Sequence, residues 1–169
     1  MPRARFAEIL RLLAENEVEF IVVGMAAGIL HGAPVTTVDL DLVHRRTREN
    51  VGRLLRVLSD LDATYRHDPR RLRPGESHLI GPGHQLLATT YGDLDCLGTI
   101  DEDRGYDELL PLSVEMALGE GRTVRVLTLP ALIELKERAG RPKDLAALPV
   151  LRATLDETRR QLGRGSRSS

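Results

Sequence analysis

The sequence predicts an α+β fold, close to α/β in its first half, in which helices flank a mixed β-sheet and short helices end the chain. Helix-like and strand-like segments alternate at the start, a run of short strand-like segments follows, and the last part is helical again. The length of 169 residues suits one domain. We expect that domain to span residues 1–162 and a disordered tail to occupy residues 163–169.

The first half of the chain contains three helix-like and two strand-like segments. Apolar residues at helical spacing predict an amphipathic helix over 4–16, and the β-branched run VEFIVV predicts a buried strand over 18–23. Glycines spaced four residues apart over 24–32 lie on one face of a predicted helix, where a bare backbone can approach a sheet closely. The alternating run at 38–43 predicts a second strand, and Thr47 can cap a third helix.

The second half combines a loop, short strands and terminal helices. Two prolines and several arginines predict an exposed loop over 66–76. Three short strands are predicted after the loop, at 78–80, 85–90 and 94–97. A hairpin of 114–118 with 123–129 follows, and then helices over 129–139 and from Pro142 to about Leu162. We expect Pro149 to kink or split the last helix.

Composition excludes several classes of protein. Apolar residues make up 41% of the chain and aromatic residues only 3%, so we expect an aliphatic core and no stacking platform for nucleic acid. The 24 Lys and Arg against 25 Asp and Glu give a formal charge of −1, so strong sequence-specific nucleic-acid binding is not expected. The single cysteine, Cys96, excludes intramolecular disulfides and multi-cysteine zinc sites.

The chain has no sequence signal for a membrane. Its longest apolar stretch, 20–30, is far shorter than the roughly 20 residues of a membrane-spanning helix. Arg3, Arg5 and Glu8 occupy the region where a signal peptide has its apolar run. We therefore expect a soluble, cytoplasmic protein without a membrane partner.

Two carboxylates stand out in the second predicted strand. Asp39 and Asp41 are two residues apart, so they project from the same face while Leu40 points to the other. Carboxylates this close repel each other unless a cation lies between them, and hard oxygen ligands select Mg²⁺ or Mn²⁺. An ordinary strand with a solvated polar face is the alternative interpretation of the same triplet.

The surroundings of this pair favour the metal site. A strand ends at Gly24 and a helix follows, so backbone N–H groups there are available to a phosphate. A third acid, Asp95, lies between apolar neighbours on a later predicted strand. An acidic triad facing an anion-binding turn is what two-metal phosphoryl or nucleotidyl transfer requires.

The stretch VVGMAAGILHGAPVTTVDLDLV resembles the core of the DNA polymerase β-like nucleotidyltransferase superfamily, whose pattern is hG[GS] followed by hDh[DE]h. The run YGDLDCLG is similar to the strand that carries the third carboxylate of that superfamily. LIELKERAGRPKDLAAL resembles the C-terminal segment of small bacterial members related to the minimal and abortive-infection types. The resemblance covers residues 18–150 and implies the nucleotidyltransferase fold.

The resemblance also implies roles for individual residues. Asp39, Asp41 and Asp95 would be the catalytic and metal-binding carboxylates, with Asp95 helping to deprotonate the acceptor hydroxyl and Asp93 competing for that role. Gly24 would open the triphosphate-binding turn. The other implied nucleotide-binding residues are Met25, Thr37, Lys136, Arg141 and Lys143, with Asp144 completing the C-terminal motif. For the cations of that motif, surface charge at a helix end is an equal alternative.

Two positions depart from the family pattern. Met25 stands where the family has a second Gly or Ser, and Val35 stands where close relatives often carry an Arg. A bulky side chain at the turn and a missing cation both weaken triphosphate binding.

Two functions follow as expectations from this resemblance. The first is a Mg²⁺-dependent (or Mn²⁺-dependent) transferase that moves a nucleoside monophosphate from an NTP, with ATP as the expected nucleotide, to a hydroxyl of a protein, an RNA or a small molecule. The alternative is a catalytically weakened binding module that acts as an antitoxin or regulatory partner. In either case a partner protein is a candidate to supply the acceptor surface, because the chain leaves little room for a separate acceptor domain.

Overall fold

The computed structural model describes residues 5–167, and within them the strands form one mixed sheet. The strands are β1 (Phe20–Val23), β2 (Asp39–His44), β3 (Thr64–Tyr65), β4 (His84–Thr89), β5 (Gly92–Leu97), β6 (Ser113–Gly119) and β7 (Arg122–Leu127). Their order across the sheet is β3-β4-β5-β2-β1-β7-β6. β2 pairs in parallel with β5, and β1 pairs in parallel with β7, while the other neighbouring pairs are antiparallel. The predicted mixed sheet is confirmed.

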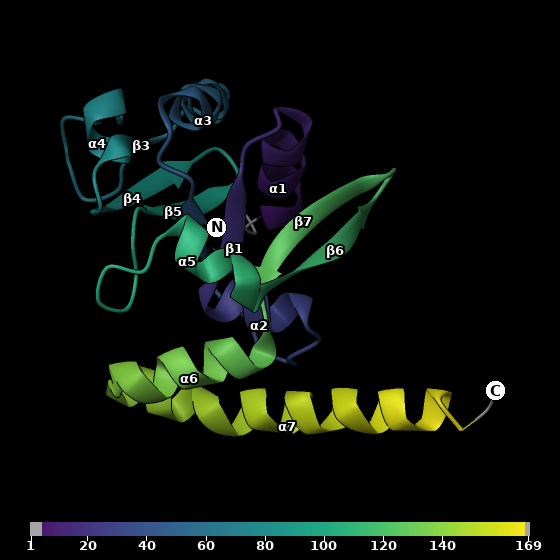
Figure 1. The fold of residues 1–169 in the computed structure, drawn as a ribbon. Coiled ribbons are helices and arrows are strands. Elements are labelled where there is room, and N and C mark those ends of the chain that lie inside the picture. The colour runs from purple at the N-terminus through teal and green to yellow at the C-terminus, as the bar shows by residue number, and fades with distance from the viewer. Residues whose placement is uncertain (1–4, 168–169) are drawn as a thin grey trace.

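Most of the helices lie in two groups (Figure 1). The helices are α1 (Phe6–Glu15), α2 (Gly24–Leu30), α3 (Arg48–Asp60), α4 (Glu76–Ile80), α5 (Tyr106–Leu109) with the 3₁₀ turn η1 (Leu110–Leu112), α6 (Leu129–Ala139) and α7 (Pro142–Gly165). α1 and α3 pack together on one side, whereas α2, α6 and α7 form a second group on the opposite side. None of the helices within residues 5–167 is long and apolar enough to span a membrane.

The core is aliphatic, as the composition predicts. β1 is buried along its whole length, and Leu40 and Leu42 of β2 are fully buried beside it. On α1 the residues Ile9 and Leu13 are fully buried, which confirms the amphipathic helix within the described residues. Position 4, where the predicted helix begins, lies outside the described part of the chain.

Several predicted local features are confirmed. The hydroxyl of Thr47 accepts a hydrogen bond from the backbone N–H of Asn50 at 3.2 Å, so Thr47 caps α3. β6 and β7 form the predicted hairpin around Gly119–Gly121. The predicted bounds of 129–139 are those of α6, and Pro142 lies in the first turn of α7.

The strand predicted at 78–80 is wrong, because this segment is the end of helix α4. Gly75 precedes the helix in an extended conformation, and its N–H donates to Nδ1 of His78 at 3.0 Å, which stabilises the first turn. Only Leu79 of the apolar pair at 79–80 is fully buried. A short apolar run does not distinguish a strand from one turn of helix.

The last helix also differs from the prediction. α7 continues through Pro149 without a break and has 24 residues, so it is neither split nor short. Pro149 and Leu145 are both exposed, so the Leu145 carbonyl, which loses its helical donor at Pro149, lies on the solvent side. The helix extends to Gly165, three residues into the predicted tail, while residues 168 and 169 lie outside the described part.

The contact between α2 and α7 depends on a glycine. A Cβ atom at Gly28 would lie 2.9 Å from Cδ2 of Leu151, closer than side-chain atoms approach each other. Gly28 therefore lets the fully buried Leu151 approach the backbone of α2. Of the glycine face predicted to approach a sheet, Gly24 lies against Asp41 of β2, whereas Gly28 receives a side chain of helix α7.

We expect Leu151→Ala to lower the free energy of unfolding by about 2–5 kcal/mol, because it removes buried methyl groups and leaves a cavity against α2. Leu145→Ala on the same helix is the matched control, since Leu145 is 49% exposed, and its effect should stay within about 0.5 kcal/mol. Urea denaturation measures both. Equal effects of the two substitutions would contradict the packing of α7 described above.

Candidate active site

The parallel pairing of β2 with β5 brings acidic residues together. Asp39 is the register partner of Asp93, and Asp41 is the partner of Asp95, so all four side chains leave the same face of the sheet. Asp39, Asp41 and Asp95 each offer a carboxylate oxygen, and these oxygens lie within 4.8 Å of one another. The predicted convergence of the three carboxylates is therefore confirmed, while their catalytic role stays a prediction.

The electrostatics of this group favour a bound cation. Burial, the hydrogen bond and charge of Asp95, and the charge of Asp39 together raise the pKa of Asp41 to about 7. Burial also raises the pKa of Asp95, against the hydrogen bond from Asp41 and the charge of Arg66. Without a cation, Asp41 and Asp95 thus share a proton. Three hard oxygen ligands are the donor set that Mg²⁺ or Mn²⁺ prefers, so the residues fit such an ion.

Gly24 lies directly against this group. It is the first residue of α2 with φ of +64°, and a Cβ atom there would lie 2.4 Å from Oδ2 of Asp41. Only glycine satisfies both the left-handed backbone and the short distance to the carboxylate. The sequence prediction that a glycine turn faces the acidic pair is therefore consistent with the structure.

Met25, Thr37 and Val35 lie around the same end of the sheet. The side chain of Met25 packs against the core, and its Cε lies 3.7 Å from the position of a Cβ atom on Gly28, one turn further along α2. The hydroxyl of Thr37 donates to the backbone carbonyl of Asp39 at 3.2 Å and lies 3.3 Å from its Oδ1, so Thr37 orients Asp39. Val35 also packs against the core.

Of the predicted cations, the structure connects Lys136 to the acids. Its positive charge lowers the pKa of Asp41, and its ammonium group lies 3.0 Å from Oδ1 of Asp144. Arg141 binds the other oxygen of Asp144 through Nε at 2.6 Å. Lys143 is exposed and has no ion-pair partner within residues 5–167.

Arg66, which was not predicted as a site residue, lies in the segment predicted to be an exposed loop. Its side chain is only 16% exposed, and Nη2 lies 2.8 Å from Oδ1 of Asp95. Nη1 lies 3.2 Å from Oδ2 of Asp93. No local sequence signal identifies this arginine, since three other arginines share the segment and its partner Asp95 is 29 residues away along the chain.

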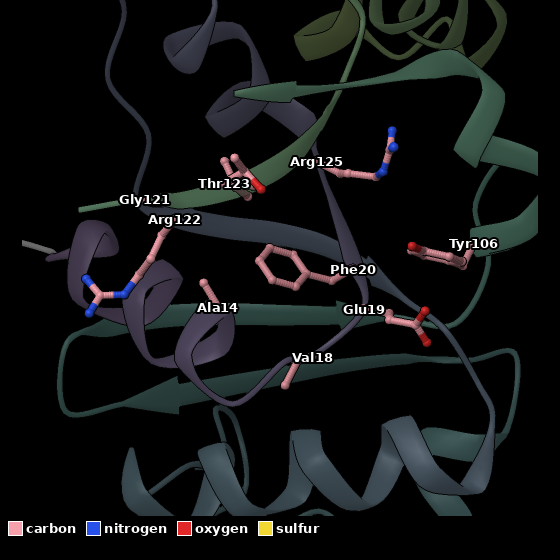
Figure 2. Close-up of a pocket in the computed structure, with 10 residues that line it drawn as sticks. Ala14, Val18, Glu19, Phe20, Tyr106, Gly121, Arg122, Thr123 and Arg125 are labelled. Carbon is pink, nitrogen blue, oxygen red and sulfur yellow. The ribbon is translucent and has the colours of Figure 1, made fainter. Parts of the chain in front are cut away.

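Two cavities described in the structure lie away from the acids. The first, of about 360 Å³, opens where β7 separates from β1 and is lined by Phe20, Tyr106 and Thr123 (Figure 2). The second, of about 400 Å³, lies between α7 and the segment that follows α2. Neither cavity includes Asp39, Asp41 or Asp95 in its lining.

Comparison with known proteins identifies the fold. No protein-family model matches the sequence, and no curated protein is significantly similar to it. Among solved structures, ANT(2″)-Ia in complex with adenylyl-2″-tobramycin matches with a TM-score of 0.57 and 21% identity over 97% of each chain. The solution structure of the antibiotic-resistance factor ANT(2″)-Ia matches with a TM-score of 0.54 and 16% identity, covering 97% of this chain and 96% of that one. TM1012 of Thermotoga maritima, a candidate nucleotidyltransferase, matches with a TM-score of 0.54 and 18% identity, covering 90% and 91%.

The chain has the nucleotidyltransferase fold. The matches extend over nearly the whole of each chain, so the helices α6 and α7 fall within the matched region. The predicted α+β nucleotidyltransferase fold is thereby confirmed, whereas the relation to the minimal and abortive-infection types stays a prediction.

The raised pKa of Asp41 gives the cation-free nucleotidyltransferase fold a specific pH dependence. Its folded value of about 7 lies above the ordinary value of 3.8, so between these values the folded protein keeps a proton that the unfolded chain has released. The free energy of unfolding should therefore fall as pH rises from about 4 to 7. Asp41→Asn should flatten this fall and raise stability at pH 8 by roughly 2–4 kcal/mol. Denaturant titrations in a chelating buffer at several pH values measure the slope, and an unchanged slope in the variant would contradict the assignment.

Proposed function

We propose that this chain is a Mg²⁺-dependent (or Mn²⁺-dependent) nucleotidyltransferase that moves a nucleoside monophosphate from an NTP, with ATP as the expected nucleotide, to a hydroxyl group. One observation carries the proposal: three buried or half-buried carboxylates on adjacent strands converge beside the Gly24 turn, in a nucleotidyltransferase fold. Such a group is costly to keep without a cation, because the carboxylates repel each other.

In this proposal Asp39, Asp41 and Asp95 hold the divalent cations. When bound, the cations polarise the α-phosphate and neutralise the charge of the departing pyrophosphate. The acceptor oxygen attacks the α-phosphorus in line. The bond between the α-phosphorus and the oxygen that bridges to the β-phosphate breaks, and pyrophosphate leaves with that electron pair. Asp95 accepts the hydroxyl proton, and Thr37 keeps Asp39 oriented through its hydroxyl.

The remaining residues bind the triphosphate in this proposal. The backbone at Gly24 and Met25 lies where α2 begins, against Asp41, and offers N–H groups to phosphate oxygens. Lys136 adds a positive charge near Asp41, with Arg141 sharing its partner Asp144. Lys143 is exposed and free of ion pairs in the described residues, so it is available to a bound phosphate or acceptor.

Three classes of molecule are candidates for the acceptor. The ANT(2″)-Ia complex contains adenylyl-2″-tobramycin, an adenylylated small molecule, so a small-molecule hydroxyl is one candidate here alongside a protein or an RNA. A partner protein supplying the acceptor surface would fit the single nucleotidyltransferase-like domain that we propose, whose last helix extends to Gly165 and not to residue 162 as predicted. We place this activity in the cytoplasm.

A weakened module with an antitoxin or regulatory role is the second candidate. Val35 favours it, since this position packs against the core and provides no cation for the phosphates. Met25 favours it less than the sequence implies, because its terminal methyl lies beside Gly28, one turn beyond the glycine turn.

Substitution of the first two carboxylates tests the enzyme directly. We expect Mg²⁺ or Mn²⁺ to raise the melting temperature of the wild type, since a ligand of the native state alone stabilises it. The double substitution Asp39→Asn with Asp41→Asn should abolish that response. It should also lower transfer of label from [α-³²P]ATP by about a hundredfold or more, because the cation stabilises the charge of the transition state by several kcal/mol. Asp156→Asn on the exposed side of α7 is the control and should change neither readout. A cation response that survives in the double variant would refute the metal site.

Calorimetry with a non-hydrolysable ATP analogue separates the enzyme from the weakened module. If Met25 blocked the turn, Met25→Ser would add a hydrogen bond to a phosphate worth roughly 1.5–3 kcal/mol, or about ten- to a hundredfold in affinity. Because Cε of Met25 points toward Gly28, we expect Mg²⁺-dependent binding by the wild type and no such gain in the variant. Weak wild-type binding that Met25→Ser rescues would support the module instead.

A further inference from the structure

Four carboxylates face one another on β2 and β5, yet only three of them form the convergent group. The two strands carry the same triplet, Asp-Leu-Asp, at 39–41 and 93–95, and the triplets are paired in register. Asp93 and Asp95 therefore leave the same face as the first pair, but the convergent group contains Asp95 and not Asp93. Pairing alone does not distinguish Asp93 from Asp95, but their exposure and their distances to Arg66 differ.

Arg66 is the side chain that contacts both of these aspartates. It follows β3 directly, and its backbone N–H donates to the carbonyl of Leu86 at 3.0 Å. Its Nη1 donates to the carbonyl of Leu87 at 3.3 Å. Both ends of Arg66 are thus attached to β4, the strand next to β5, so the position of the guanidinium is fixed relative to both aspartates.

The guanidinium divides its two terminal nitrogens between these aspartates. Nη2 lies 2.8 Å from Oδ1 of Asp95, and Nη1 lies 3.2 Å from Oδ2 of Asp93. The side chains of Asp95 and Asp93 are 9% and 37% exposed, so the arginine binds a buried partner and a partly solvated one. A planar fork holds two carboxylates at a set separation, which a flexible ammonium group cannot do.

We infer that Arg66 is a positioning residue that selects Asp95 over Asp93 as the third ligand and so sets which divalent cation the site prefers. The inference rests on the proposed function. Arg66 engages one oxygen of Asp95, leaves the other for the cation, and holds Asp93 outside the group of three. The cation then meets few protein oxygens in a fixed arrangement.

The number and rigidity of ligands distinguish the divalent ions. Mg²⁺ binds through few carboxylates in near-octahedral geometry, and Mn²⁺ suits the same hard oxygen ligands, whereas Ca²⁺ takes six to eight oxygens in flexible arrangements. Without Arg66, Asp93 and both oxygens of Asp95 become available to the ion. Loss of Arg66 therefore favours Ca²⁺ relative to Mn²⁺, beyond the general effect of removing one positive charge.

Calorimetric titration with Mn²⁺ and with Ca²⁺ tests this in the wild type, Arg66→Met, Arg66→Lys and Lys136→Met. Lys136→Met is the control for charge: it removes one positive charge near Asp41 and leaves the contacts of Asp93 and Asp95 in place, while it also removes one partner of the buried Asp144, so its stability is measured alongside. We expect Arg66→Met to lower the preference for Mn²⁺ over Ca²⁺ by about tenfold, the usual scale for a residue that orients a ligand. Lys136→Met should strengthen the binding of both ions by a similar factor. The preference of Arg66→Lys for Mn²⁺ over Ca²⁺ should lie between those of the wild type and Arg66→Met.

The outcomes separate this inference from the proposed function. If Arg66→Met changes both affinities by one common factor, as Lys136→Met does, Arg66 acts only through its charge and the inference is overturned. If the wild type binds neither ion, the metal site itself fails, and the proposed function fails with it. Thermal unfolding of each variant reports whether it is folded, and Arg66→Lys, which keeps the charge, provides the test should Arg66→Met not fold.

Discussion

The in-register parallel pairing of β2 with β5 is the constraint on which the site depends. It places Asp41 beside Asp95, and it places Leu40 beside Leu94 on the other face, where both leucines are fully buried. A slip of one residue along either strand would turn its carboxylates into the core and its leucines out of it. The apolar core therefore fixes the register, and the register in turn forces the carboxylates together.

Groups from distant segments offset the repulsion between these carboxylates. Arg66, which follows β3, neutralises Asp93 and Asp95 from one side, and Lys136 of α6 acts on Asp41 from another. A proton shared by Asp41 and Asp95 removes a further negative charge in the absence of a cation. These contributions reduce the repulsion within the acidic group in the absence of a cation, and in the proposed function a bound divalent ion would take the place of the proton.

Local sequence patterns predicted the carboxylates and Lys136, but not Arg66, the arginine that binds two of the carboxylates. The period of two in β2, the apolar neighbours of Asp95 and the glycine that begins α2 are all signals within a few residues, and the structure confirms their arrangement. Arg66 was missed because its ion pair with Asp95 spans 29 residues and its own segment is polar. The helix at 76–80 and the two-residue strand β3 were missed since segments this short carry no period that separates helix from strand.

The structure gives the C-terminal motif a packing role, while its part in ligand binding stays a prediction. Asp144 is fully buried, and although burial raises the pKa of a carboxyl, the hydrogen bonds from Arg141 and Lys136 hold the pKa of Asp144 below its usual range. A buried carboxylate with two cationic partners is costly to disrupt, because removal of either partner leaves charge unpaired. Asp144 lies in the first turn of α7 and Lys136 in α6, so this ion pair fastens the corner between the two helices. The positive charge of the same lysine acts to lower the pKa of Asp41, against the larger effect of burial, so the junction that stabilises the C-terminal helices also contributes to the charge at the acidic group.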